Sequence, residues 1–228
     1  MAAQAAKRKG GAKPRGKAKP RTATLYAAKG GGSMIVEAAY ALAGKPLKVV
    51  DIDWSDTGWH SRTLKKLNPL GQVPTLLLPD GAVMTESAAI LIHLAETSPK
   101  AKLMPPAGAK DRARFLRWLV FFVSAIYPTF TYGDDPKRWL DGDETAGKKL
   151  RAGTDKHRKM LWRFVEKHAG MPWFLGKQFS LLDLYLMPMT WWRPGYAWFE
   201  AECPKLHAIG QRVQKLPQVA PVRARQNP

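Results

Sequence analysis

Strand-forming patterns occur only in the first half of this 228-residue chain, and that asymmetry restricts the fold more than any other feature. Short apolar runs with strand spacing lie at residues 23–28, 47–53, 74–78 and 82–84, and helical spacing lies at residues 33–43 and 86–97. The first strand, helix and strand form a βαβ unit with a parallel crossover, and the Pro-Asp-Gly sequence at 79–81 marks a hairpin turn. This order predicts a four-stranded mixed sheet with helices packed on it.

The rest of the chain shows only helical spacing. Residues 99–109 are rich in proline and alanine and are typical of a linker, and helical patterns follow at residues 110–130, 145–168, 181–191 and 204–216. The first of these helices is apolar on two sides, so we expect it to pack against more than its own core. The predicted organisation is a basic tail at 1–22, an α/β domain at 23–98, the linker, an all-helical domain at 110–219 and a C-terminal tail at 220–228.

The net charge of +19 is unevenly distributed. Residues 1–22 hold eight of the 37 lysine and arginine residues and no acidic residue, so the remaining chain has 29 basic against 18 acidic residues. The tail lacks the apolar side chains that offset the entropy cost of folding, so we expect it to be disordered. It is a solvated tail or an over-long start of the reading frame, or it contacts nucleic acid, a ribosome or an anionic membrane surface.

The chain lacks the signals of several protein classes. No apolar run approaches the ~18 residues of a membrane span, and no apolar stretch follows the basic N-terminus as it does in a secretory signal. The single cysteine, Cys203, cannot form an internal disulfide or a cysteine-rich zinc site, which fits a reducing, cytoplasmic setting. The five histidines show no metal-ligand pairing, and glycines 30–32 lack the spacing of a phosphate-binding loop, so we expect no metal.

One local signal predicts folding rather than chemistry. Ser180 and Asp183 have the spacing of a capping box, in which each side chain accepts from the other residue's backbone N–H. This pair predicts a helix start inside the helical domain.

Four segments, in this order, resemble the bacterial cytosolic glutathione S-transferase family. They are LYAAKGGGSMIVEAAYALAGKPLKVVDID, NPLGQVPTLLLPDGAVMTESAAILIHLAE, FSLLDLYL and CPKLHAIGQRVQKLPQV, which together reach from residue 24 to about residue 219. The resemblance implies a thioredoxin-like α/β domain followed by an all-α helical-bundle domain. It also implies glutathione as co-substrate, a hydrophobic electrophile as second substrate, and a homodimer.

The resemblance places glutathione against Gln72, Val73, Pro74, Glu86 and Ser87. Relatives with this Gly-Gln-Val-Pro segment hold the proline cis, which turns the N–H and C=O of Val73 outward to pair with the cysteinyl backbone of the peptide. The helix that begins near Ser87 can hold a carboxylate at its N-terminus, and Glu86 can hold the neighbouring ammonium. The alternatives are that Pro74 only starts an edge strand and that Ser87 only caps a helix.

Ser33 is the predicted contact of the glutathione sulfur. It follows the glycines and begins a helix, so its hydroxyl and the helix N-terminus can both stabilise a thiolate. Lowering a thiol pKa of ~8.5 by two units requires about 2.7 kcal/mol, and a charged hydrogen bond (about 1.5–3 kcal/mol) with a helix terminus (about 0.3–1 kcal/mol) supplies it. Ser33 could instead serve only as a helix cap, and Tyr26 is the competing donor.

Two positions depart from the beta-class pattern. Gly32 stands where that class has a cysteine, and Tyr127 stands where it has a histidine on the long helix. Mixed-disulfide chemistry on an enzyme cysteine is therefore disfavoured, and activation by a hydroxyl remains. Trp118, Phe121 and Tyr127 are predicted to line the electrophile pocket, with burial in the core as the alternative.

The predicted function is thiolate activation of glutathione for attack on a hydrophobic electrophile, as in detoxifying transferases. The alternative is a non-catalytic transferase-like scaffold that uses its basic tail to contact nucleic acid or a ribosome. Binding of glutathione rests on more residues than catalysis does, because catalysis depends mainly on Ser33.

Overall fold

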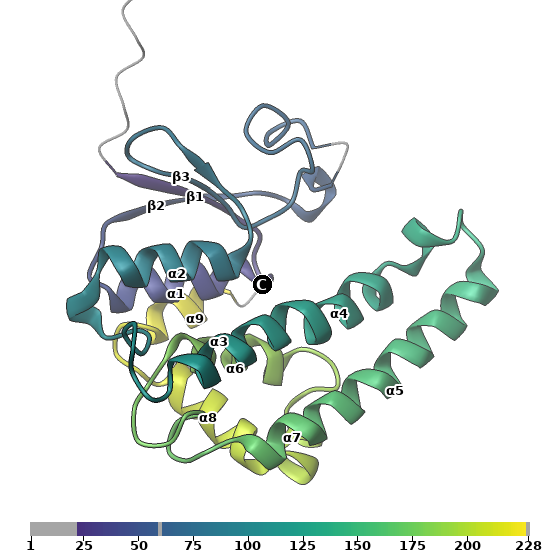
Figure 1. Ribbon diagram of the computed structural model, residues 1–228. Coiled ribbons are helices and arrows are strands. Elements are labelled where there is room, and N and C mark those ends of the chain that lie inside the picture. The colour runs from purple at the N-terminus through teal and green to yellow at the C-terminus, as the bar shows by residue number, and fades with distance from the viewer. Residues whose placement is uncertain (1–21, 59–60, 227–228) are drawn as a thin grey trace, which may run out of the picture.

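The computed structural model describes residues 22–58 and 61–226, so the predictions for the basic tail fall almost entirely outside the described residues. The chain begins with a four-stranded sheet and continues with helices (Figure 1). The strands are β1 (Ala23–Ala27), β2 (Leu47–Asp51), β3 (Thr75–Leu77) and β4 (Val83–Met84). Their order is β2-β1-β3-β4, with β1 and β2 parallel and the other pairs antiparallel, which confirms the predicted mixed sheet.

Helices α1 (Ser33–Leu42) and α2 (Ser87–Thr97) lie between this sheet and the remaining helices (Figure 1). The strand β1 alternates in burial, and Leu25 is fully buried in the cluster that also contains Ile35 and Ile90. Alternating strand residues face opposite sides of a sheet, so this apolar row packs on the helices. The position of α1 matters for the site because its N-terminus follows directly from the glycines after β1.

The second part of the chain is helical in the described residues. Its α-helices are α3 (Arg112–Phe121), α4 (Tyr127–Asp134), α5 (Glu144–His168), α6 (Leu181–Trp191), α7 (Tyr196–Glu202), α8 (Pro204–Gln214) and α9 (Ala220–Arg225). Short 3₁₀ turns lie at η1 (Trp54–Asp56), η2 (Pro99–Ala101) and η4 (Pro136–Trp139). The helix α6 is the centre of this part, because all but one of its residues are buried.

The predicted long helix is longer than expected and contains a widened turn. The π-helical segment η3 (Phe122–Ile126) joins α3 to α4, and the Tyr127 N–H bonds to the Phe122 carbonyl. Pro128 follows at once and has no N–H, and its ring clashes with the carbonyl four residues earlier in a regular helix. A π turn opens that space, and such turns are frequent at functional sites.

By length and composition, this continuous helix (Arg112–Asp134) is the one described helix that could cross a membrane. The sequence contains no uninterrupted apolar run of that length, which is why none was expected. Phe115, Trp118 and Phe122 on this helix are buried in the protein core.

The capping box at the start of α6 is confirmed. The Asp183 carboxylate accepts from the backbone N–H of Ser180 at 2.7 Å and from that of Phe174 at 2.7 Å, and it is fully buried. Asp183 therefore holds both its own helix and the preceding loop. The sequence pattern predicted the first contact and not the second.

We expect Asp183→Ala to lower the free energy of unfolding by about 2–4 kcal/mol, because it leaves two buried N–H groups without an acceptor. Asp143→Ala is the matched control, since Asp143 caps α5 by accepting from Thr145 and Ala146 at an exposed position. Its loss should cost about 1 kcal/mol. Chemical denaturation of the two variants checks the difference, and equal losses would contradict the structural role given to Asp183.

Candidate functional site

Three glycines, at positions 30–32, form the loop between β1 and α1, and glycine is favoured at each position for a different structural reason. Gly30 has a φ of +75°, in the left-handed region that favours glycine. A Cβ on Gly31 would lie 2.9 Å from the Trp54 ring. A Cβ on Gly32 would overlap the Tyr127 hydroxyl and lie 3.2 Å from the Tyr127 Cζ atom. Close packing therefore excludes side chains at positions 31 and 32, and the backbone conformation disfavours one at position 30.

Both backbone groups of Gly30 are held by distant segments. The Trp192 indole N–H donates to the Gly30 carbonyl at 2.9 Å, and the Gly30 N–H donates to the Gln226 side chain at 3.0 Å. The Trp54 indole N–H donates to the neighbouring Lys29 carbonyl at 2.9 Å. These contacts fix the loop from three directions, and none of them was predicted from the sequence.

The helix α9 brings Gln226 to the loop. It lies in the part predicted as a C-terminal tail and packs on α1. The Arg225 guanidinium donates to both Glu37 oxygens at 2.6 and 2.9 Å and to Asp51 at 2.7 Å, and these bonds raise the pKa of Arg225. Charge-assisted, bidentate contacts of this kind are the strongest side-chain hydrogen bonds. Arg225 therefore anchors the chain end to α1 and β2.

Ser33, the predicted thiol contact, is buried, with 1% of its surface exposed. Its hydroxyl donates to the Ala28 carbonyl at 3.2 Å and accepts from the Ala28 N–H at 3.1 Å. The hydroxyl thus closes the glycine loop on itself. Its hydrogen must leave the Ala28 carbonyl before it can be given to a sulfur.

Tyr127 lies against the same loop from the helical side. Its hydroxyl is buried and has no hydrogen-bond partner in the described part of the chain. Its ring packs edge-on against Tyr185 (centroids 6.2 Å apart) and Trp192 (5.9 Å). Burial raises the pKa of Tyr127 well above its usual value of 10, so the phenol keeps its proton. The structure therefore places an unused donor at the start of α1.

The Val73–Pro74 peptide bond is cis, as the resemblance implied. Thr75 and Asn68 shape the segment from behind: the Thr75 hydroxyl donates to the Gln72 carbonyl at 2.7 Å, and the Asn68 amide donates to the same carbonyl at 3.1 Å. Within the described residues, neither the N–H nor the C=O of Val73 has a hydrogen-bond partner. An extended peptide can pair with both groups.

Glu86 and Ser87 lie at the N-terminus of α2. Glu86 is exposed and has a φ of +64°, which is uncommon for a residue with a side chain. The Ser87 hydroxyl lies 2.9 Å from the Tyr185 hydroxyl on α6. Because Tyr185 also packs against Tyr127, one buried tyrosine connects the two expected ends of the ligand site.

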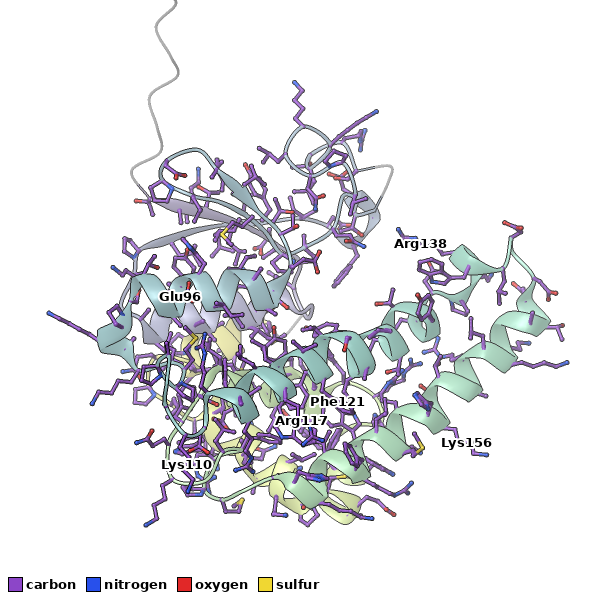
Figure 2. The ribbon with its side chains drawn as sticks, in the orientation of Figure 1. Glu96, Lys110, Arg117, Phe121, Arg138 and Lys156 are labelled. Atoms are coloured by element: carbon purple, nitrogen blue, oxygen red, sulfur yellow. The ribbon has the colours of Figure 1, made fainter. Side chains whose placement is uncertain are left out.

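The other predicted residues lie elsewhere. Trp118 is 1% exposed, and its ring packs against Phe174, His168 and Phe121 in the helical core. Phe121 is half-buried, and its ring lies 5.7 Å from Phe164 of α5 (Figure 2). These contacts correspond to the core alternative, and the structure brings only Tyr127 of the three to the glycine loop.

Tyr26 is half-buried on β1, and strand alternation places it on the face opposite Leu25, away from α1. The competing thiol donor of the sequence analysis thus lies on the sheet face that α1 and α2 leave uncovered.

Cys203 is unsuited to nucleophilic catalysis. Burial raises the pKa of the Cys203 thiol to about 12, so it is a poor nucleophile. Residues 22–58 and 61–226 contain no group of three or more metal-ligating side chains.

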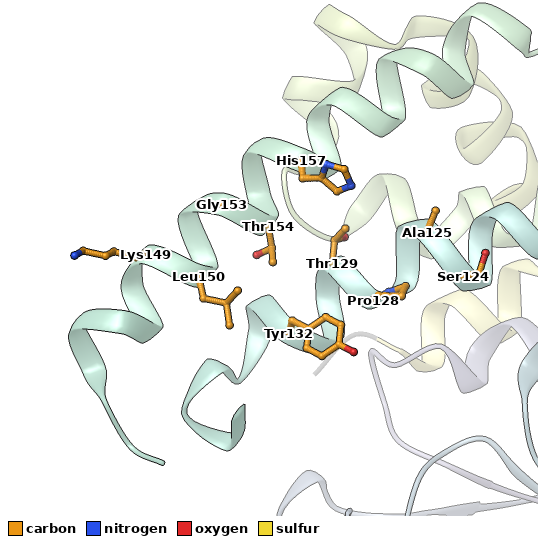
Figure 3. A pocket seen from close by; sticks show the side chains of 10 residues that line it. All are labelled: Ser124, Ala125, Pro128, Thr129, Tyr132, Lys149, Leu150, Gly153, Thr154 and His157. Atoms are coloured by element: carbon orange, nitrogen blue, oxygen red, sulfur yellow. The ribbon is translucent and has the colours of Figure 1, made fainter. Parts of the chain in front are cut away.

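A second surface feature is a groove of about 680 Å³ between α4 and α5 (Figure 3). Its lining includes Ala125, Pro128, Tyr132, Leu150 and His157. Exposed apolar side chains lie on α3, at Val120, and on α5, at Met160 and Phe164. This face is separate from the glycine loop.

Comparison with known proteins gives consistent matches. Residues 33–97 match the family model described as glutathione S-transferase, N-terminal domain. The GST-like protein YncG of Escherichia coli K12, described as uncharacterized, is 38% identical over 87% of this chain and 95% of its own length. The glutathione S-transferase GstA of Escherichia coli O157:H7 is 28% identical over 67% of this chain and 73% of its own.

Solved structures agree with these matches. The crystal structure of a glutathione transferase homologue from Sulfitobacter with bound glutathione has a TM-score of 0.78 and 25% identity, over 90% of this chain and 98% of its own. A glutathione transferase from Methylococcus capsulatus has a TM-score of 0.71 and 28% identity, over 90% and 98%.

We expect Gln226→Ala to accelerate amide exchange at Gly30 and to cost about 1–2 kcal/mol, because the Gly30 N–H loses its acceptor. Gln218→Ala, at an exposed position on the same chain end, is the control and should leave both quantities unchanged. Hydrogen-exchange mass spectrometry on the loop peptide checks this. Unchanged exchange in the Gln226 variant would show that the chain end does not hold the loop.

Proposed function

This chain belongs to the glutathione S-transferase family, and on that premise we propose that it binds glutathione and adds it to a hydrophobic electrophile. The observation that carries the proposal is the unpaired backbone of Val73 at the cis Val73–Pro74 bond. A γ-glutamyl tripeptide has a backbone that can pair with Val73, a terminal carboxylate and ammonium suited to Ser87 and Glu86, and a thiol. The binding of glutathione by the Sulfitobacter homologue supports the same site.

The reaction requires a thiolate. The thiol proton leaves to solvent, the sulfur attacks an electrophilic carbon, and the leaving group departs with its bonding pair. The N–H groups of Gly32 and Ser33, at the first turn of α1, have no partner among the described residues. Together with the helix dipole they favour an anionic sulfur at this position. From the sequence, Ser33 is expected to donate a hydrogen bond to the same sulfur.

The electrophile faces an apolar surface in this proposal. Trp54 is 56% exposed, and its ring covers Gly31. Arg138, in the turn η4 that follows α4, reaches toward the loop of the first domain, where its guanidinium nitrogens would lie 3.9 Å from a Cβ on Gly58 (Figure 2). A flat, apolar electrophile with a polarised leaving group fits these two side chains.

We also propose that the protein is a homodimer joined through the face formed by α3, α4 and α5. Val120 is 58% exposed and Met160 53%, and such large apolar side chains beside a groove mark interaction sites. A second copy of this chain is the proposed occupant because a twofold dimer joins the same face of both copies and so covers both apolar surfaces at once.

The function is tested by isothermal titration with glutathione and by conjugation of chlorodinitrobenzene. We expect Ser87→Ala to weaken binding about 10- to 100-fold, the effect of losing one hydrogen bond to a charged group. Ser98→Ala, at the opposite end of α2, should bind as the wild type does. Binding without conjugation would favour the scaffold alternative, and no binding at all would overturn the proposal.

The dimer is tested by sedimentation equilibrium. The wild type should have twice the 25.4 kDa mass of the chain, and Val120→Glu should dissociate it because a charge replaces a buried apolar side chain. Leu70→Glu, an exposed site in the first domain, is the control and should remain dimeric. A monomeric wild type would contradict this proposal and leave the glutathione site unaffected.

A further inference from the structure

We propose that the Tyr127 hydroxyl, carried by the helical part of the chain, is the group that donates a hydrogen bond to the glutathione sulfur. This inference rests on the proposed function and identifies the donor within it. Tyr127 was expected from the sequence to line the electrophile pocket, which is a different role. In the expected role the Tyr127 ring contacts the electrophile, whereas in the proposed role the Tyr127 hydroxyl contacts the glutathione sulfur.

The position of the Tyr127 hydroxyl favours contact with the glutathione sulfur. The Tyr127 hydroxyl occupies the place where a Cβ at position 32 would lie, directly at the start of α1. A side chain that activated the sulfur from within the loop would have to leave the backbone at this point or next to it. Gly32 and Tyr127 therefore depend on each other. A side chain at position 32 would clash with the Tyr127 hydroxyl, so the hydroxyl can lie here only because residue 32 is a glycine.

The Tyr127 hydroxyl also lacks a hydrogen-bond partner in the described part of the chain. A buried hydroxyl left without a hydrogen bond costs about 1–3 kcal/mol, and native proteins rarely keep one without a reason. The Tyr127 hydroxyl has none in residues 22–58 and 61–226. By contrast, the Tyr185 hydroxyl has Ser87, and the Ser33 hydroxyl has both backbone groups of Ala28.

The Tyr127 side chain is also held rigidly in place. The ring of Tyr127 is enclosed by Tyr185 and Trp192, and Trp192 also binds the loop. Two residues after Tyr127, Thr129 is bonded by the buried Arg158, which donates to the Thr129 hydroxyl and to the Thr129 carbonyl, both at 2.8 Å. These contacts hold the helix just after the π turn, so the hydroxyl is held in place relative to α1. A donor held in advance stabilises a developing charge without reorganisation.

The chemistry needs a neutral donor. Because burial keeps Tyr127 protonated, it cannot act as the base that removes the thiol proton. The thiol proton passes to water, and Tyr127 retains its own proton while donating a hydrogen bond to the thiolate. The sulfur then forms its bond to the electrophilic carbon as the leaving group departs, and the tyrosine is unchanged at the end.

A purely structural role for Tyr127 would be to fill the space above Gly32. Phenylalanine fills the same space without the hydroxyl, so Tyr127→Phe separates the two roles. The readout is the pKa of enzyme-bound glutathione, measured by the ultraviolet absorbance of its thiolate as pH is varied, together with kcat/KM for chlorodinitrobenzene.

We expect Tyr127→Phe to raise the pKa of bound glutathione by about one to two units and to lower kcat/KM near neutral pH about 10- to 100-fold. At a pH below the pKa of bound glutathione, where both proteins bind the protonated thiol, the dissociation constant of glutathione should change less than about threefold. Tyr40→Phe, which removes a hydroxyl from a buried tyrosine at the far end of α1, should match the wild type.

Ser33→Ala discriminates the competing donor. It should lower stability, because the loop loses its closing hydrogen bonds, and leave the pKa of bound glutathione unchanged. A raised pKa in Ser33→Ala with a normal pKa in Tyr127→Phe would overturn the proposal in favour of Ser33. A wild type that does not bind glutathione would overturn the proposed function, and this inference with it.

Discussion

The site depends on a loop that has no side chains. Because residues 31 and 32 are glycines, Trp54 and Tyr127 can approach the backbone more closely than any side chain would allow, and Trp192 and Gln226 bond the backbone of Gly30 beside them. Close packing of this kind makes the loop rigid, although glycines by themselves would make it the most flexible part of the chain. The groups that fix the loop come from four separate parts of the sequence, so the loop has its shape only when the two halves of the chain are packed together.

That packing is itself strongly constrained. The centre of the helical half is α6, which is held at its start by the buried Asp183 and ends near Trp192. The chain end returns to α1 through Arg225, which bonds Glu37 and Asp51. Tyr185, on α6, links Ser87 of the first half to Tyr127 of the second. A disturbance of the helical half therefore reaches both expected ends of the ligand site.

Local signals predicted much of the fold. The strand and helix spacing gave the sheet, and the Ser180–Asp183 pair gave the start of α6, because both depend on neighbours in sequence. The widened turn before Tyr127, the helix α7 and the helix α9 were not expected. Their residues show no strong periodic pattern, and their positions depend on contacts with distant segments, such as the one between α9 and α1.

The sequence by itself determined the family, the order of the elements and the segment around the cis Val73–Pro74 bond, because these depend on residues that are adjacent in the chain. It also showed two departures, Gly32 and Tyr127, as separate substitutions. Only the tertiary structure decided that these two positions touch and that the Ser33 hydroxyl is already engaged. The physical reason is that a hydroxyl's partner depends on what folding brings within about 3 Å of it, and spacing along the chain does not contain that information.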